Sequence, residues 1–285
     1  MEYAIEVKGL TKQYDSFSLK GIDLVVPKGY IMGLIGENGA GKSTTIKAIL
    51  NLIHKDSGTI NILGYDHQTY ELLVKQQIGV VFDECHFPDQ LKPKDLSLIM
   101  KNIYQSWDND GYYNYLQQFK LPENQIIKEF SRGMKMKLSL AVALAHHPKL
   151  LILDEPTSGL DPIVRNEILD IFLDFIQDEE HSILMSSHIT TDLEKVADYI
   201  TFVHDGTVIF SESKDALLND YGIIKCRAQE FEKIDSTDIM TYRQSSYSYE
   251  VLVKNKKAMS NKYRQLIIDE PTIEQLMLLH IGGTK

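Results

Sequence analysis

Apolar and polar positions alternate over the first part of the chain and predict strands. Residues 3–10 and 19–26 follow a period of two and are separated by the turn-like segment 14–18, which predicts an antiparallel hairpin layer. The apolar run 31–36 predicts a short strand that enters a glycine-rich loop. Apolar residues then recur at helical spacing over 42–53, which predicts a helix leaving that loop.

The pattern changes to a helical period from about residue 92 to about residue 145 and then alternates between strand and helix. Strands that alternate with helices favour an α/β core with a parallel sheet, into which the helical block is inserted. Beyond about residue 215 the pattern predicts a small strand-and-helix appendage that ends in a helix, with Thr272 and Gln275 at capping-box spacing. The predicted helices are 94–107, 110–119, 135–147, 161–177, 190–200 and 271–281; the predicted strands are 57–64, 149–156, 181–188 and the hairpin 199–211 with Asp205-Gly206 at its turn.

Composition narrows the class of protein. The 285 residues are 43% hydrophobic, which is enough for a substantial core. Two cysteines far apart favour a reducing compartment, and no apolar run approaches the roughly 18 residues of a membrane span. The formal charge of −10 argues against nucleic acid as a main partner and against docking on anionic lipid. We therefore expect a protein that is soluble on its own.

The segment 36–43 has the pattern G-x-x-x-x-G-K-S between a predicted strand and a predicted helix. Glycines permit the turn that points successive backbone N–H groups inward, and the helix that follows directs its positive end to the same place. In this pattern Lys42 reaches the β- and γ-phosphates of a nucleotide, and the Ser43 hydroxyl can bind Mg²⁺. The loop residues expected at the nucleotide are Gly36, Glu37, Asn38, Gly39, Ala40, Gly41, Lys42, Ser43 and Thr44.

Two adjacent carboxylates end the apolar strand predicted at 149–156. Asp154 is placed to hold Mg²⁺, and Glu155 is then free to act as general base on the attacking water. His188 ends another apolar strand, where ligands gather in open parallel sheets, so it is a candidate to donate to the γ-phosphate or to orient the water. We predict Lys42, Glu155 and His188 as the catalytic residues.

Two further segments flank the carboxylate strand and complete a family pattern. Together the motifs resemble those of the ATP-binding subunit of ATP-binding cassette (ABC) transporters, over about residues 3–215. The family's motifs match, in its order, Walker A at 36–43, the signature at 130–134, Walker B at 150–154 with Glu155, the D-loop at 158–161 and the switch histidine His188. The resemblance implies a P-loop NTPase (RecA-like) α/β core with an antiparallel β subdomain, a helical subdomain inserted at about 86–146, and a C-terminal appendage at 216–285.

In the family, two subunits bind head to tail and enclose ATP and Mg²⁺ between them. The resemblance therefore implies that Ser131 and Gly133 contact nucleotide bound by a second ATP-binding subunit, identical or different, and that Asp161 of the D-loop also belongs to the nucleotide-binding residues. It implies that Tyr14 stacks on the adenine, with Phe17 as the alternative. It also implies docking onto an integral membrane permease at the cytoplasmic face of the membrane, with no other membrane contact. The aromatic residues Phe87, Tyr104 and Trp107 of the helical block are candidates for that docking groove.

Two positions depart from the family pattern. The usual signature Leu-Ser-Gly-Gly-Gln is replaced by Phe130-Ser131-Arg132-Gly133-Met134. The glutamine usually found near Mg²⁺ is replaced by Asp83, with Gln90 as the alternative counterpart. A carboxylate can bind Mg²⁺ but, when ionised, cannot donate a hydrogen bond. We accordingly predict Ser43, Asp83 and Asp154 as metal ligands.

The leading hypothesis is an ATP-hydrolysing motor subunit that couples to a separate permease, with export favoured. One alternative is an ABC ATPase that acts without a permease, on nucleic acid or ribosomes; the single Walker A motif and the acidic charge argue against it. The other is a weakly catalytic nucleotide sensor, suggested by Asp83 and the altered signature.

Overall fold

A six-stranded sheet forms the centre of the computed structural model, which describes residues 2–245 and 247–284. Its strand order is β10-β9-β3-β8-β7-β6; all neighbours are parallel except β10, which pairs antiparallel with β9. The inner strands β3, β7 and β8 are buried along their whole length, as parallel strands covered on both faces must be. The strands are β3 (Ile31–Ile35), β6 (Ile78–Val81), β7 (Leu150–Asp154), β8 (Ser182–Ser187), β9 (Tyr199–His204) and β10 (Thr207–Ser213).

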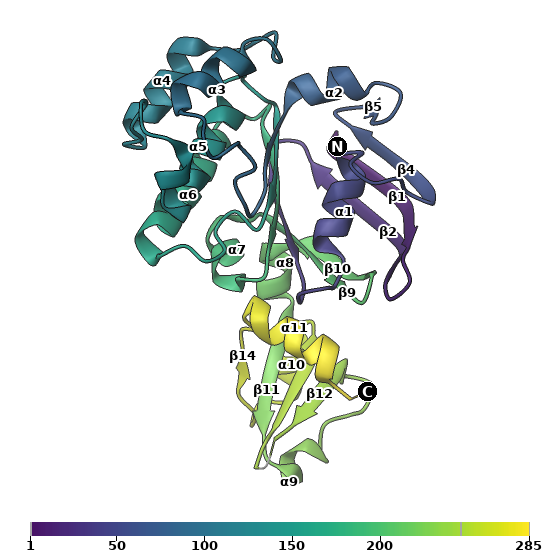
Figure 1. Cartoon of the computed structure of the whole chain (residues 1–285). Coiled ribbons are helices and arrows are strands. Elements are labelled where there is room, and N and C mark those ends of the chain that lie inside the picture. Colours follow the sequence, from purple (N-terminus) through teal and green to yellow (C-terminus); the bar gives the residue numbers. More distant parts are fainter. Residues whose placement is uncertain (1, 246, 285) are drawn as a thin grey trace.

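A second sheet is antiparallel and covers helix α1 (Lys42–Ile49). Its order is β2-β1-β4-β5, so the predicted hairpin layer of β1 and β2 is present. Ile46 and Ile49 of α1 share one apolar core with side chains of both sheets, which places the helix between them (Figure 1). The strands are β1 (Tyr3–Gln13), β2 (Ser18–Pro27), β4 (Ser57–Ile62) and β5 (Tyr65–Asp66), and helix α2 (Glu71–Gln77) follows them.

The inserted helices lie between β6 and β7 in the chain and project beside the parallel sheet (Figure 1). Helix α5 belongs to the same core as α6 and α7, on the face of the parallel sheet opposite α1. The predicted helix 94–107 ends earlier, at Met100, and continues as turns. The inserted helices are α3 (Pro93–Met100), α4 (Asn109–Gln118), the 3₁₀ turn η1 (Ile127–Glu129) and α5 (Arg132–Leu144). The core helices α6 (Pro162–Phe175) and α7 (Thr190–Val196) follow β7 and β8.

The C-terminal part forms a separate small sheet that extends from one end of the core (Figure 1). Its order is β12-β13-β11-β14, and α11 begins with the predicted capping box of Thr272 and Gln275. Leu276 of α11 packs into the main core, and the Ile273 N–H donates to Glu194 of α7 at 2.9 Å, which fixes the junction. The expected boundary after residue 215 falls inside α8. The elements are α8 (Lys214–Asn219), β11 (Tyr221–Cys226), α9 (Ala228–Phe231), β12 (Thr241–Gln244), β13 (Tyr249–Lys254), α10 (Lys256–Lys262), β14 (Ile268–Asp269) and α11 (Ile273–Gly282).

The predicted α/β class, the parallel sheet and the antiparallel layer are thus confirmed. Over residues 2–245 and 247–284 the chain contains no helix with the length and apolarity that crossing a bilayer requires.

Candidate functional site: a phosphate loop beside a carboxylate–histidine pair

The glycine loop leaves β3 and turns into α1 at the carboxyl edge of the parallel sheet. Gly39 and Gly41 have φ values of +84° and +114°, a region that favours glycine. A Cβ on Gly36 would lie 2.3 Å from the carbonyl oxygen of Val203, so the loop also needs the close backbone approach that only glycine permits. These constraints hold the loop around the amino end of α1.

Lys42 is buried and lies inside the loop that precedes it. Its ammonium donates to the carbonyl oxygens of Gly36 at 2.8 Å and Glu37 at 3.2 Å. It also lies 3.4 Å from a carboxylate oxygen of Glu155. The charge is thereby held where a phosphate bound by the loop would meet it.

Asp154 and Ser43 meet beneath the loop. The Ser43 hydroxyl donates to Asp154 Oδ1 at 3.1 Å, and the carboxyl group is 4% exposed. No cluster of three or more His, Cys, Asp or Glu side chains that would hold a metal alone occurs among the residues described. The hydroxyl and carboxylate oxygens are nevertheless donors that suit Mg²⁺ when phosphate oxygens complete its shell. The residues present therefore fit a metal shared with the nucleotide.

Ser186 is a site residue that the sequence analysis missed. It stands level with Asp154 in the β7–β8 pairing, donates to Asp154 Oδ1 at 2.6 Å, and accepts from the Glu155 N–H at 3.0 Å. Its signal was a serine beside another serine at the end of an otherwise apolar strand. Ser186 therefore holds the Asp154 carboxylate and the backbone of Glu155 at once.

Glu155 and His188 form a close pair across the loop. His188 Nδ1 lies 2.6 Å from Glu155 Oε2, and the His188 N–H donates to the same oxygen at 3.3 Å. Glu155 has a φ of +52°, an uncommon conformation for a residue with a side chain. Such strain concentrates at functional sites. The Glu155 carboxylate contacts Lys42 with one oxygen and His188 with the other.

A cavity of about 440 Å³ brings most of the predicted residues together. Gly36, Ala40 and Asp154 lie just behind its wall, in the loop and at the end of β7. Gln90, the alternative to Asp83, lies in the turn before α3 and does not line this cavity. The lining residues are Phe17, Glu37, Asn38, Gly39, Gly41, Lys42, Ser43, Thr44, Asp83, Glu155, Ser158 and His188.

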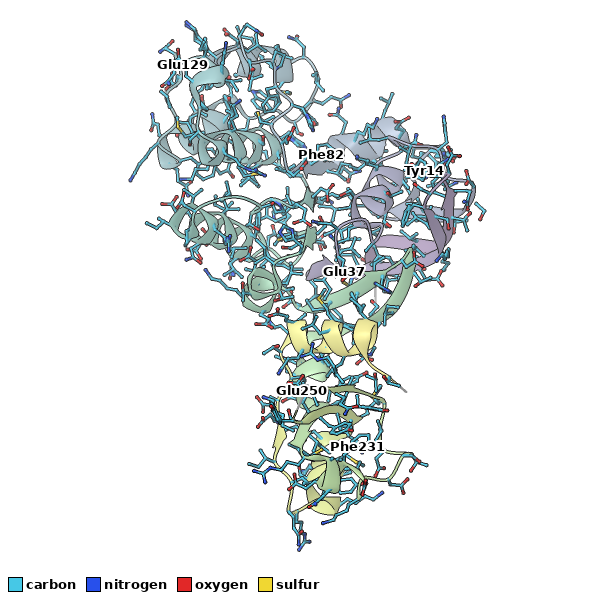
Figure 2. All side chains as sticks on the ribbon, turned by 60° about the horizontal axis from the view of Figure 1, so that its bottom comes forward. Tyr14, Glu37, Phe82, Glu129, Phe231 and Glu250 are labelled. Carbon is cyan, nitrogen blue, oxygen red and sulfur yellow. The ribbon has the colours of Figure 1, made fainter. Side chains whose placement is uncertain are left out.

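The structure places Phe17, the alternative aromatic residue, on the cavity wall. Tyr14 is not among the lining residues; it is 42% exposed, with the Lys12 ammonium 5.6 Å from its ring centroid. Tyr14 lies in the turn between β1 and β2, and Figure 2 labels it apart from Glu37 of the glycine loop.

The remaining predicted residues, Ser131, Gly133 and Asp161, lie outside this cavity at the beginnings of two helices. Ser131 caps α5 by accepting from the Met134 N–H, and Asp161 caps α6 by accepting from two backbone N–H groups. Both side chains are exposed, while Gly133 packs against Val164. The chain alone therefore does not bring them to its own phosphate loop.

Comparison with known proteins agrees with this geometry. Residues 19–158 match a family described as ABC transporter. The chain is 30% identical to the ABC transporter ATP-binding protein YtrB of Bacillus subtilis (strain 168), over 99% of both chains. It is 34% identical to the bacitracin transport ATP-binding protein BcrA of Enterococcus faecalis, over 73% of this chain and 69% of that protein.

A solved structure of an ATP-binding subunit of an ABC transporter superposes with a TM-score of 0.67 at 28% identity, covering 75% of this chain and 91% of that one. The cassette fold and the relatives together settle the assignment: this chain belongs to the ATP-binding proteins of ABC transporters, the family whose ATP-binding domain hydrolyses ATP.

Proposed function

We propose that this chain is the ATP-hydrolysing motor subunit of an ABC exporter, working with a separate membrane permease from the cytoplasmic face of the membrane. The observation that carries the proposal is the cluster of Lys42, Glu155 and His188. Glu155 contacts the other two, and all three line the same cavity as the phosphate loop, at the carboxyl end of the parallel sheet. The similarity to a bacitracin transport ATP-binding protein supports a role in transport.

Each residue of the cavity has a distinct task. The loop N–H groups and the amino end of α1 bind the phosphates, and Lys42 neutralises their charge. Ser43 and Asp154, with Asp83, would hold Mg²⁺, which supplies charge neutralisation on the phosphate oxygens. Glu155 accepts the proton of the attacking water, and His188, hydrogen-bonded to Glu155, orients that carboxylate and faces the terminal phosphate. Phe17 offers the aromatic face for the base.

Ser131, Gly133 and Asp161 serve a site on a second ATP-binding subunit. The support for Ser131 and Gly133 is their place at the exposed N-terminus of α5, where N–H groups and a hydroxyl can receive an anion from outside the chain. Asp161 is exposed at the start of α6 and lies outside this chain's own nucleotide cavity, but its carboxylate is not an anion-binding group. In this arrangement ATP binding closes the two subunits on each other, and hydrolysis allows them to separate again. A ligand held between two subunits shifts their equilibrium because it binds the closed state more tightly.

The permease-docking surface consists of Leu72, Leu73, Leu98, Ile99 and Ile103, which are 41–82% exposed. The first two belong to α2 and the others to α3 and the turn after it. Gln76 of α2 donates to the Ile103 carbonyl at 2.9 Å and accepts from the Gln105 N–H at 2.9 Å, which joins the two segments. Exposed apolar patches of this kind mark interaction sites.

The aromatic residues expected in the docking groove are engaged elsewhere. Phe87 and Trp107 pack against the main core, and Tyr104 stacks on His146 with ring centroids 3.9 Å apart. They therefore support the helical block from inside.

Phosphate release from purified protein with and without reconstituted permease tests the proposal. Turnover that depends on Mg²⁺ and rises with permease supports a motor. A protein that binds ATP but releases no phosphate in either condition would instead be a nucleotide sensor, the alternative that Asp83 and Arg132 favour.

A further inference from the structure

Arg132 lies flat against the D-loop of its own chain. A Cβ placed on Gly159 would lie 2.8 Å from Arg132 Nη1 and 3.0 Å from its Cζ, so the guanidinium fills the space beside that glycine. The neighbouring Ser158 lines the nucleotide cavity. Because the family signature has glycine at the position of Arg132, this contact is a feature of this chain's own sequence.

A second cavity, of about 310 Å³, separates Arg132 from the loop that follows β6. It is lined by Asp83, Glu84, Cys85, Phe130, Arg132, Lys135 and Met136. Lys135 pairs with Asp89 at 3.3 Å. Within the part of the chain that the structure describes, Asp83, Glu84 and Arg132 make no ion pair at 4.0 Å or less. Arg132 is therefore the cation of this cavity that has no carboxylate already bound to it.

Asp83 lines both cavities, whereas Glu84 lines only the second. Asp83 shares the nucleotide cavity with Ser43 and the phosphate loop, and it shares the second cavity with Arg132. An ionised carboxylate has acceptor capacity for a metal or for a guanidinium, and both prefer it to water. The two cavities therefore offer Asp83 two alternative cationic partners.

We propose that Arg132 is a positioning residue that competes with Mg²⁺ for Asp83. With the guanidinium as partner, Asp83 ties the signature segment to the loop after β6. With the metal as partner, Asp83 releases the signature segment and D-loop for closure on a second subunit. This inference rests on the proposed nucleotide site, and it explains why the chain carries both departures from the family pattern, Asp83 and Arg132, around one cavity.

The test is the binding of a non-hydrolysable ATP analogue, measured by calorimetry over a range of Mg²⁺ concentrations. Arg132→Gln removes the competing charge, so the Mg²⁺ concentration for half-maximal binding should fall by roughly two- to fivefold, the range of an exposed ion pair. Arg132→Lys keeps the charge and should remain close to wild type. In an Asp83→Asn background, Arg132→Gln should cause no further shift.

Two variants separate this competition from general electrostatics. Lys135→Gln removes a cation from the same cavity, but one already paired with Asp89, and should leave the Mg²⁺ dependence unchanged. Glu84→Gln removes a carboxylate that does not reach the nucleotide cavity and should do the same.

An unchanged Mg²⁺ dependence in Arg132→Gln overturns the inference, as does an equal shift in the Asp83→Asn background or in Lys135→Gln. If the wild type fails to bind the analogue at any Mg²⁺ concentration, the nucleotide site itself is wrong. The two failures are therefore distinguishable.

Discussion

The phosphate loop and the signature segment differ in how far one chain completes them. Lys42 and Asp154 are 5% and 4% exposed, and each has hydrogen-bond partners within the chain. Ser131 and Asp161 are exposed, and among residues 2–245 and 247–284 their side chains hydrogen-bond only to the first turns of their own helices. The difference supports the proposal that the phosphate loop binds a ligand of this chain while the signature segment and D-loop serve a ligand held by another subunit.

Glu155→Gln should have the largest effect on turnover. It changes the phosphate-loop part of the site, which one chain completes by itself. Loss of a positioned general base lowers turnover by about 10²- to 10⁴-fold, while ATP binding should persist because the loop contacts remain. Phosphate release and calorimetric binding measure the two quantities. Equal turnover in wild type and variant would remove Glu155 from the role of base.

Ser131→Arg should affect the signature segment, which lies outside this chain's own nucleotide cavity. The longer charged side chain obstructs closure on a second subunit, so turnover should fall by roughly 10²- to 10³-fold, as on loss of a transition-state donor. Nucleotide affinity of the isolated subunit should be unaffected, since Ser131 lies outside the cavity. Normal turnover would contradict a role in a neighbouring site.

Lys42→Ala should lower both turnover and the nucleotide affinity of the isolated subunit, because Lys42 neutralises the charge of the bound phosphates. A charge-assisted hydrogen bond contributes about 1.5–3 kcal/mol, so ATP affinity of the isolated subunit should fall roughly 10- to 100-fold. Equilibrium binding of a fluorescent ATP analogue measures this. The placement of Lys42 would be refuted by an affinity equal to that of wild type.

A smaller effect, on folding stability, should come from two buried histidines in the core that supports both parts of the site. His146 binds the Ile78 carbonyl at the start of β6, and His67 binds the Ile49 carbonyl at the end of α1. Burial lowers the pKa of both histidines below 6.5, so the unfolded chain binds more protons than the folded one as pH falls below that value. Stability should therefore be fully present above pH 6.5 and should decrease below it, by at most about 1.4 kcal/mol per pH unit for each histidine.

Urea midpoints at pH 7.5 and 5.5 check this expectation, with His146→Gln as the matched variant. Glutamine can donate to the same carbonyl without titrating, so the variant should show the smaller decrease. A midpoint that stays constant or rises at pH 5.5 would contradict it.

The contiguous parts of the site could be predicted from the sequence, because Gly36–Ser43 and Leu150–Glu155 encode both local backbone shape and chemistry. The aromatic residue could not be assigned between Tyr14 and Phe17, since the Tyr14 N–H bonds the Phe17 carbonyl in a turn whose direction depends on the sheet register. Ser186 was missed because its role arises only from lying level with Asp154 across two strands.

Contacts between segments that are far apart in the chain also could not be predicted from the sequence. The packing of Arg132 on Gly159 requires the signature helix and D-loop to be brought together by the fold, and the second cavity at Asp83 is closed by residues of the inserted helical block. The sequence also did not show how Phe87, Tyr104 and Trp107 pack, because hydrophobic spacing alone does not reveal how much of a side chain faces the core.

Mixing two inactive variants tests the shared site most directly. Lys42→Ala retains its signature segment, and Ser131→Arg retains its phosphate loop. If two copies of this chain form the site, an equimolar mixture contains mixed dimers with one intact site each, and should recover about a quarter of wild-type phosphate release. A mixture no more active than its separate components would contradict a site shared between two copies of this chain.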